Sequence, residues 1–384
     1  MSDRKQPVLG VLGGGQLARM LALAAAPLGI KTLVVDGAVD ACAGQVAPLV
    51  VTEWTDTVAL EAFAGQVDAV TFDFENVPAD TARRLAEQVG VHPSPQALAV
   101  AQDRLAEKTL FRECGLSTPE FMAVDTREDL ARALAVIGAP AILKTRRLGY
   151  DGKGQFRLKA LDDADAAWAA LGGQAATLGL ILEAFVPFER ELSVIAVRGR
   201  DGEFRTWPLT QNWHVDGVLS MSLAPAPAID ELQQRATALA KTLAERLDYV
   251  GVFALELFVK DGELLGNEMA PRVHNSGHWT IEGAPTSQFE NHVRAVLGLP
   301  LGDTRARGLS TMFNWIGELP DAAPVLRAVD AHWHDYGKQA RPGRKVGHAT
   351  VCAPGAPELV TRLTALADAL GRGEQAGPVV NALR

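Results

Sequence analysis

The first forty residues alternate between apolar runs and an amphipathic segment. Residues 8–12 form a short apolar run, and the apolar positions of residues 17–28 recur at helical spacing. A second apolar run, residues 33–35, ends at Asp36. This order predicts a βαβ unit with a parallel sheet.

The pattern changes after the two prolines of residues 92–95, which mark the end of a first unit. Alternating positions such as residues 252–259 then predict antiparallel strands. A helix is predicted from Ser287, a residue suited to capping, to Gly298, a residue suited to ending a helix. The tail predicts short strands and one alanine-rich helix near residues 357–370.

Composition narrows the class of protein. The 384 residues are 48% hydrophobic and 22% charged, as expected of a globular chain with two or three domains. A net charge of −9 argues against binding to nucleic acid or to an anionic membrane. The three cysteines lack CxxC spacing, and there is no signal-peptide pattern or long apolar run, so we expect a reduced, cytoplasmic protein.

A glycine loop stands between the first strand and the first helix. Gly13 to Ala18 fit the pattern G-x-G-x-x-A, and Asp36 follows Gly15 by about 20 residues, as in dinucleotide-binding proteins. Three interpretations are open: an NAD oxidoreductase, a site for another ligand phosphate, or glycines that only permit close packing.

A second glycine-rich segment, residues 149–154, lies between two predicted strands. It cannot be a P-loop, because Gly154 stands where Ser or Thr is required. A glycine hairpin can lie over a triphosphate, with Lys144 and Lys153 supplying positive charge. We expect a lid that closes over the nucleotide; the alternative is a solvated basic hairpin.

Two glutamates interrupt apolar strands. Glu256 and Glu268 lie on either side of an Asp261–Gly262 turn, and Asn267 precedes Glu268. Magnesium prefers one or two carboxylates plus phosphate oxygens, so the pair suits Mg-ATP, although structural ion pairs are an alternative. A two-residue turn would place Glu268 on the face opposite Glu256, so we predict a loop of three or five residues.

Three motifs together carry a family resemblance over almost the whole chain. They are GYDGKGQ at residues 149–155, NEMAPRVHNSGHW at 267–279 and RPGRKVGH at 341–348. The chain resembles the N5-carboxyaminoimidazole ribonucleotide synthetase family, which are ATP-grasp enzymes of purine synthesis. The first motif is broadly typical of ATP-grasp enzymes, whereas the other two are more specific.

The resemblance implies a mixed α/β fold, α+β overall, of the ATP-grasp type. It implies a Rossmann-like parallel-sheet domain at residues 1–103. An antiparallel-sheet ATP-grasp domain would follow at residues 104–298, with a lid subdomain at about 118–187. A small β-rich domain would occupy residues 299–384.

The resemblance also implies the reaction. Bicarbonate attacks the γ-phosphate of ATP to give carboxyphosphate, and the amine of 5-aminoimidazole ribonucleotide then takes up the carboxyl group. The implied cofactor is Mg2+ or Mn2+, held by Glu256 and Glu268, and the implied assembly is a homodimer. Arg272, Lys144 and Lys153 are the implied catalytic residues.

The family pattern assigns the ATP site. The hinge of residues 183–186 would follow a strand that ends at residue 182 and read adenine through its backbone, and Glu191 would bind the ribose. The implied ATP-binding residues are Arg104, Lys144, Gly149, Tyr150, Asp151, Gly152, Lys153, Gly154, Gln155, Glu183, Ala184, Phe185, Val186, Glu191, His214, Asn267 and Glu268.

A basic cluster in the tail is unusual in an acidic protein. It lies between Lys338 and Lys345, and we expect it to grip the substrate's phosphate or the bicarbonate; a solvated charge run is the alternative. The predicted substrate-binding residues are Gln16, Glu75, Arg272, His274, Asn275, Ser276, Lys338, Arg344 and Lys345. Two other classes stay open: an NAD oxidoreductase, and a nucleotide sensor without turnover.

Overall fold

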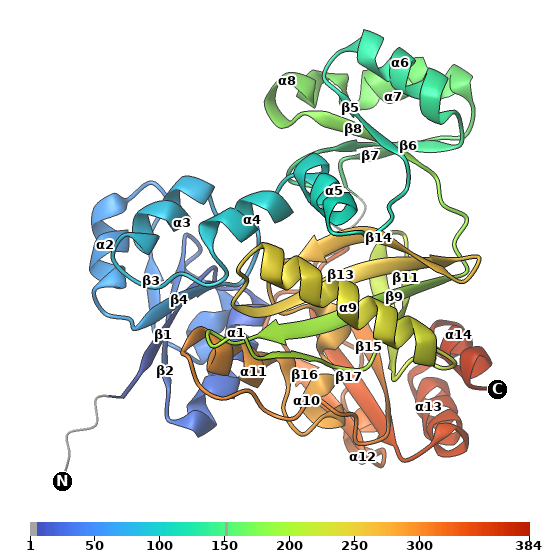
Figure 1. The fold of residues 1–384 in the computed structure, drawn as a ribbon. Coiled ribbons are helices and arrows are strands. Elements are labelled where there is room, and N and C mark those ends of the chain that lie inside the picture. Colours follow the sequence, from blue (N-terminus) through green and yellow to red (C-terminus); the bar gives the residue numbers. More distant parts are fainter. Residues whose placement is uncertain (1–5, 150–152) are drawn as a thin grey trace.

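The computed structural model describes residues 6–149 and 153–384, in which three β-sheets form the framework (Figure 1). The first is the predicted parallel sheet, with strand order β3-β2-β1-β4. Its strands are β1 (Val8–Leu12), β2 (Lys31–Asp36), β3 (Leu49–Val51) and β4 (Ala69–Phe72). The helices of this part are α1 (Gln16–Ala25), α2 (Thr57–Ala64), α3 (Ala79–Ala86) and α4 (Pro95–Ala101).

A four-stranded antiparallel sheet stands apart at the top of Figure 1. Its strands, in the order β5-β8-β6-β7, are β5 (Phe121–Val124), β8 (Leu180–Ala184), β6 (Ala141–Thr145) and β7 (Gln155–Leu158). Three helices accompany it: α6 (Arg127–Ile137), α7 (Ala164–Leu171) and α8 (Ala175–Leu178). Thr126 begins α6 with a complete capping box.

The largest sheet has nine strands, in the order β14-β13-β9-β11-β12-β15-β17-β16, with β10 beside β9. They are β9 (Arg190–Arg198), β10 (Phe204–Thr206), β11 (Thr210–Val215), β12 (Val218–Ala224), β13 (Gly251–Lys260), β14 (Glu263–Ala270), β15 (Leu309–Ile316), β16 (Ala331–Asp335) and β17 (Lys345–Ala353). Its helices are α5 (Arg104–Glu113), α9 (Asp230–Arg246), α10 (Thr280–Gly283), α11 (Gln288–Val296), α12 (Ala323–Arg327), α13 (Ala356–Leu370) and α14 (Gly373–Leu383). We call this nine-stranded sheet the central sheet. The strands of the tail, β15 to β17, continue it, because β15 pairs with β12.

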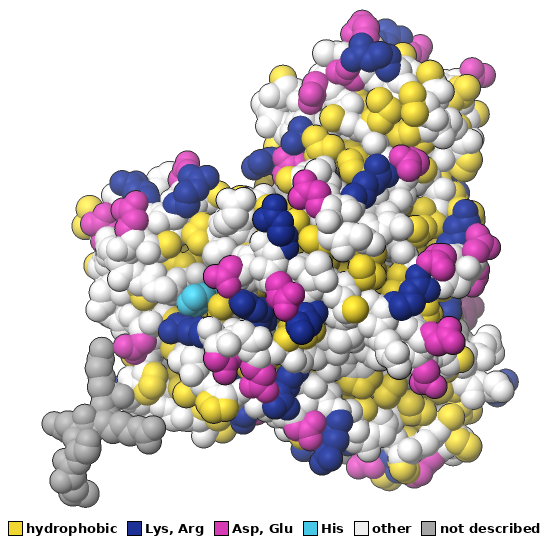
Figure 2. All heavy atoms as spheres, viewed as in Figure 1, with side chains coloured by type: hydrophobic (Ala, Val, Ile, Leu, Met, Phe, Trp, Pro, Cys, Tyr) yellow, Lys and Arg dark blue, Asp and Glu magenta, His cyan; other side chains and the backbone are white. Residues whose placement is uncertain are grey.

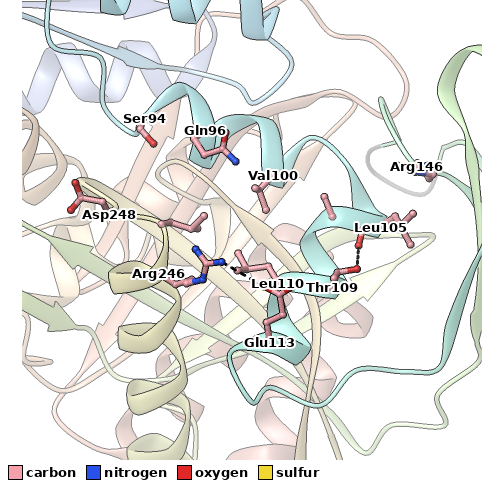
Figure 3. A pocket seen from close by; sticks show the side chains of 12 residues that line it. Ser94, Gln96, Val100, Leu105, Thr109, Leu110, Glu113, Arg146, Arg246 and Asp248 are labelled. Atoms are coloured by element: carbon pink, nitrogen blue, oxygen red, sulfur yellow. Dashed lines mark hydrogen bonds and ion pairs between the residues drawn. The ribbon is translucent and has the colours of Figure 1, made fainter.

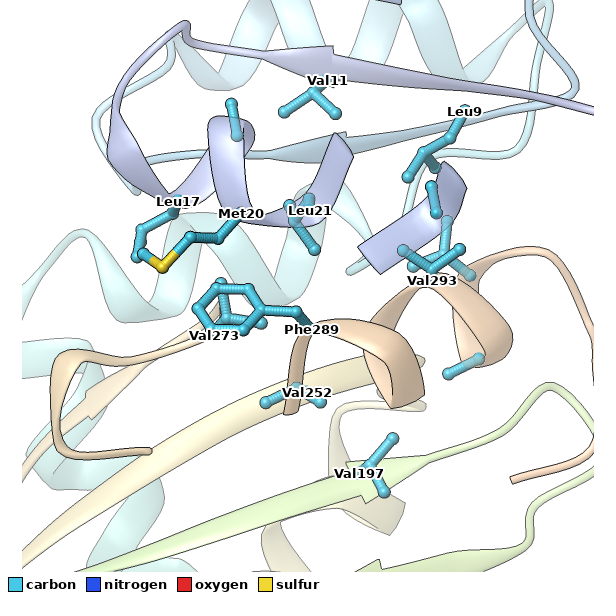
Figure 4. Close-up of a cluster of buried hydrophobic side chains, with 14 of the residues drawn as sticks. Leu9, Val11, Leu17, Met20, Leu21, Val197, Val252, Val273, Phe289 and Val293 are labelled. Atoms are coloured by element: carbon cyan, nitrogen blue, oxygen red, sulfur yellow. The ribbon is translucent and has the colours of Figure 1, made fainter. Parts of the chain in front are cut away.

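A buried apolar cluster joins the parallel sheet to the central sheet (Figure 4). Leu17, Met20 and Leu21 of α1 face Phe289 and Val293 of α11. All five side chains are at most 6% exposed, so the cluster fixes how these two sheets face each other. The cleft described below depends on that arrangement.

Basic and acidic side chains are interspersed on the face shown in Figure 2, without one broad basic patch. Within the described residues, no helix is both long and apolar enough to cross a membrane.

Candidate active site

A cleft of about 1200 Å³ lies where the three sheets meet. The predicted site residues that line it are Gln16, Glu75, Arg104, Lys144, Gly149, Lys153, Gln155, Glu191, His214, Glu256, Asn267, Glu268, Arg272, His274, Asn275, Lys338, Arg344 and Lys345. Those that the structure places away from its wall are Gly154, Glu183, Ala184, Phe185, Val186 and Ser276. The lid prediction and the predicted contacts of Tyr150, Asp151 and Gly152 lie outside the described residues.

The two predicted metal carboxylates lie directly opposite each other on β13 and β14. Our prediction of a three- or five-residue loop is wrong: Lys260 pairs with Glu263, so the turn has only two residues. The same face is restored by a β-bulge at Asn267, which lets Glu256 pair with Glu268 while Leu257 pairs with Gly266. One extra residue in a strand reverses the alternation of side chains beyond it.

The carboxylate pair is electrostatically suited to a cation. Burial and the charge of Glu268 raise the pKa of Glu256 to about 7. Burial alone would also raise the pKa of Glu268, but Arg104, 3.1 Å away, lowers it. Among the described residues, no group of three or more His, Cys, Asp or Glu could hold a metal by itself. A magnesium ion here would therefore need phosphate oxygens, as in Mg-ATP sites.

Lys144 reaches the cleft from β6 and is held by Glu183. The Lys144 Nζ lies 2.8 Å from Glu183 Oε2. Burial raises the pKa of Glu183, but the charges of two lysines, Lys144 included, lower it to about 2. Glu183 lies inside β8, so our expectation that the strand ends at residue 182 is wrong. The buried carboxylate of Glu183 binds Lys144. Our prediction of a hinge that reads adenine through its backbone did not include this role.

The predicted adenine hinge continues from β8. The amide of Ala184 donates to Glu120 O at 2.8 Å, and that of Phe185 donates to Pro140 O at 3.1 Å. These two amides are therefore already used in holding the four-stranded sheet together.

Glu191 and His214 form a pair on the adjacent strands β9 and β11. The His214 Nδ1 lies 2.8 Å from Glu191 Oε2. Burial alone would lower the pKa of His214, but the hydrogen bond to Glu191 and the charge of Glu256 raise it. The raised pKa of His214 favours the protonated ring, whose N–H groups can donate to phosphate oxygens.

The opposite wall joins segments that are far apart in sequence. Arg272 forms an ion pair with Glu75, and Lys338 donates a hydrogen bond to Gln16. Ser276 is fully buried, and its Oγ accepts a hydrogen bond from Ser193 Oγ at 2.7 Å. It therefore does not reach the cleft, contrary to our prediction.

Domain and sequence comparisons agree with this geometry. Residues 7–102 match the ribonucleotide synthetase preATP-grasp domain, residues 109–289 the ATP-grasp domain, and residues 310–362 the phosphoribosylaminoimidazole carboxylase C-terminal domain. The N5-carboxyaminoimidazole ribonucleotide synthase of Pseudomonas aeruginosa is 51% identical over 90% of this chain and 94% of the relative. The chain belongs to the N5-carboxyaminoimidazole ribonucleotide synthase family.

Solved structures extend the likeness. The synthetase of Thermus thermophilus has a TM-score of 0.89 and 55% identity, covering 94% of this chain and 98% of that one. The synthase of Aspergillus clavatus, in complex with ADP and 5-aminoimidazole ribonucleotide, has a TM-score of 0.87 and 34% identity, covering 96% and 99%. The ATP-grasp fold expected from the sequence is thereby confirmed.

In this member of the synthase family, carboxylates of the protein itself occupy the first glycine loop. The Gly14 amide donates to Asp36 Oδ2 at 2.6 Å. The amides of Gly15 and Ala18 donate to Asp73 at 3.0 and 2.7 Å. A dinucleotide phosphate would need these amides, so the NAD interpretation is wrong. Another ligand phosphate would need the same amides, so the interpretation that the glycines permit close packing is favoured. Sequence reasoning missed Asp73, although the acidic residue after β4 was the available signal.

A second hollow, of about 770 Å³, lies on the other side of α5 (Figure 3). Its floor is apolar, with Val100, Leu105 and Leu110, and Arg246 lies 3.8 Å from Glu113 at its edge. None of the predicted site residues within the described ranges lines it. Within the described residues, the predicted site residues that line a hollow therefore lie around the larger cleft.

Proposed function

We propose that this chain uses ATP to carboxylate 5-aminoimidazole ribonucleotide with bicarbonate, giving N5-carboxyaminoimidazole ribonucleotide. One observation carries the proposal. The same cleft contains a carboxylate pair suited to Mg-ATP and, across from it, the basic tail residues Lys338, Arg344 and Lys345. The complex of the Aspergillus clavatus relative with ADP and 5-aminoimidazole ribonucleotide supports the same pair of ligands.

The proposed reaction has two steps. A bicarbonate oxygen attacks the γ-phosphorus of ATP, which forms carboxyphosphate and releases ADP. The substrate amine nitrogen then bonds to the carboxyl carbon while the bond from that carbon to the phosphate oxygen breaks, releasing phosphate and one amine proton. Such phosphoryl transfer depends mainly on positioning and on compensating charge. Lys144, Lys153 and Arg104 would compensate the phosphate charge.

Glu256 and Glu268 would hold Mg2+, or Mn2+, and Asn267 would assist. The fit rests on two carboxylates paired across adjacent strands, one of which has a pKa raised to about 7. When bound, the ion would neutralise charge that develops on the transferring phosphoryl group.

The substrate ribonucleotide would lie towards the parallel sheet. Arg272, His274 and Asn275 would contact it from the central sheet, and Lys338, Arg344 and Lys345 would bind its phosphate or the bicarbonate. Gln16 and Glu75 would complete the site, since they follow the carboxyl ends of β1 and β4, where open α/β sheets place their ligands.

A homodimer and a cytoplasmic location also belong to this proposal. The family resemblance supports the first. The described cysteines, Cys42, Cys114 and Cys352, are all free thiols, as expected in a reducing compartment.

The deciding experiment is ADP release measured by a coupled assay with bicarbonate and 5-aminoimidazole ribonucleotide each present or omitted. We expect rapid ADP release only when both are present. ATP binding without bicarbonate-dependent turnover would instead indicate a nucleotide sensor, and would overturn the proposal.

A further inference from the structure

Two side chains of α5 hold the backbone on both sides of Glu268. The Lys108 Nζ donates to the carbonyl oxygen of Asn267 at 3.0 Å. The amide of Met269 donates to Glu107 Oε1 at 2.6 Å. The residue before Glu268 and the residue after it are thus both fixed by one helix.

The position of β14 explains why these contacts are needed. It is an edge strand of the nine-stranded sheet, and the bulge at Asn267 also interrupts its pairing with β13. Backbone groups on such an edge have no neighbouring strand, so they need other partners. Besides the two contacts from α5, the Gly266 amide donates to Ser117 O at 2.7 Å.

The sequence spacing of the α5 residues suits this task. Arg104, Glu107 and Lys108 stand at positions i, i+3 and i+4, which share one face of a helix. Arg104 contacts the Glu268 carboxylate itself, at 3.1 Å. Glu107 is 2% exposed and Lys108 is fully buried. Burial and the charge of Glu268 raise the pKa of Glu107 to about 8. A buried lysine such as Lys108 needs specific partners that compensate its charge.

Lys108 also links the two antiparallel sheets. Its Nζ lies 3.3 Å from Glu183 Oε2, the same oxygen that binds Lys144. Glu183 is in β8, whereas Asn267 is in β14. The ammonium group of Lys108 therefore connects Lys144, through Glu183, to β14, the strand that carries Glu268.

We propose that Glu107 and Lys108 are positioning residues that hold the bulge of β14, and so keep the Glu268 carboxylate aligned with Glu256 for the divalent cation. This inference rests on the proposed metal site. Groups that orient metal ligands without touching the metal typically change metal affinity about 10- to 100-fold when they are removed.

The test measures Mn2+ affinity directly, from the electron paramagnetic resonance signal of free Mn2+ in the presence of ADP. Lys108→Met removes the ammonium group while keeping much of the side-chain volume, and we expect affinity to fall at least about tenfold. Lys241→Met is the matched control, because the Lys241 side chain is 57% exposed on α9 and its ammonium group lies 3.8 Å from Glu245 Oε1. The control should change affinity by less than about threefold.

A second pair of variants isolates the hydrogen bond at Glu107. Glu107→Gln keeps an oxygen that can accept the Met269 amide, whereas Glu107→Met does not. We expect only Glu107→Met to weaken Mn2+ binding about tenfold and to raise the Mg2+ concentration for half-maximal turnover. This pair decides the question even if Lys108→Met does not fold.

Three outcomes separate the ideas. Folded Lys108→Met and Glu107→Met proteins that bind Mn2+ as tightly as the parent would overturn the positioning role. Equal weakening by Glu107→Gln and Glu107→Met would also overturn it, because the acceptor would then be irrelevant. If Glu268→Gln itself leaves Mn2+ affinity unchanged, the proposed metal site is wrong, whatever the α5 variants do.

Discussion

Gly15 lies against the carboxylate of Asp73, and its replacement by alanine tests what the first glycine loop does. A Cβ at this position would lie inside van der Waals contact of Asp73 Oδ2 and 3.1 Å from its Cγ and Oδ1. The backbone φ of −76° suits any residue, so the cost is purely steric. Asp73 would have to move away from the amides that it binds.

The distances set the size of the effect. The Gly15 amide is 3.0 Å from Asp73 and the Ala18 amide is 2.7 Å from it. Because N–H···O bonds extend to about 3.2 Å, a retreat of roughly 0.5 Å breaks the first and leaves the second at its limit. A hydrogen bond to a charged group contributes about 1.5–3 kcal/mol. We therefore expect Gly15→Ala to lower the free energy of unfolding by about 2–4 kcal/mol.

Urea unfolding of a double-mutant cycle with Asp73→Ala measures this coupling. Once the carboxylate is absent, the added methyl has nothing to displace, so the double variant should be no less stable than Asp73→Ala alone. Gly377→Ala is the control: nothing lies within 4 Å of its added Cβ in α14, and it should stabilise by about 0.5–1 kcal/mol.

Catalysis supplies the second half of this test. The KM for ATP of Gly15→Ala should stay within about twofold, because the loop amides bind Asp36 and Asp73 and are not available to a nucleotide phosphate. Additive losses of stability in the cycle, or unchanged stability with a much higher KM for ATP, would refute the reasoning.

The remaining predictions concern the metal pair, the basic tail and a buried histidine. Glu268→Gln and Glu256→Gln should each lower ADP formation by about 100-fold or more, with an unchanged circular dichroism spectrum; near-normal ADP formation at ordinary magnesium would contradict the assignment. Arg344→Ala combined with Lys345→Ala should raise the KM for 5-aminoimidazole ribonucleotide or bicarbonate about 10- to 100-fold, with little change for ATP; an unchanged KM for both would remove these residues from the site. Burial lowers the pKa of His292 to about 3, and its ring accepts a backbone amide at 2.9 Å. The stability that neutral His292 contributes is therefore complete above pH 6.5 and is lost as the pH falls towards 3, by up to about 1.4 kcal/mol per pH unit. Urea unfolding of His292→Asn, which keeps an acceptor but does not titrate, should show a smaller loss over this range, and an equal loss in both proteins would contradict the role of His292.

Local signals in the sequence determined several elements directly. The βαβ order of the first domain is confirmed, because buried strands and amphipathic helices leave distinct periodicities. The helix expected after Ser287 is α11, and Ser287 accepts the Glu290 amide as its N-cap. The tail helix is confirmed as α13, but the pattern missed α14, in which Pro378 lies inside the helix.

Tertiary contacts decided the features that the sequence pattern left open. The periodicity of β13 and β14 suggested a longer turn, whereas the structure combines a two-residue turn with a bulge. Asp261 and Gly262 both have positive φ, which suits a tight hairpin turn. No local signal in the sequence shows whether the extra residue lies in the turn or in a bulge within one strand.

The family resemblance identified many of the charged and polar residues that line the cleft, because several of them lie in short contiguous motifs. The roles of Asp73, Glu107 and Lys108 could not be identified in this way, since each acts on backbone groups about 55 to 160 positions away. Hydrogen bonds over such separations depend on how the sheets and α5 pack. The sequence alone therefore determined the local elements and the family. The bulge in β14, which only the tertiary structure shows, places Glu256 and Glu268 opposite each other.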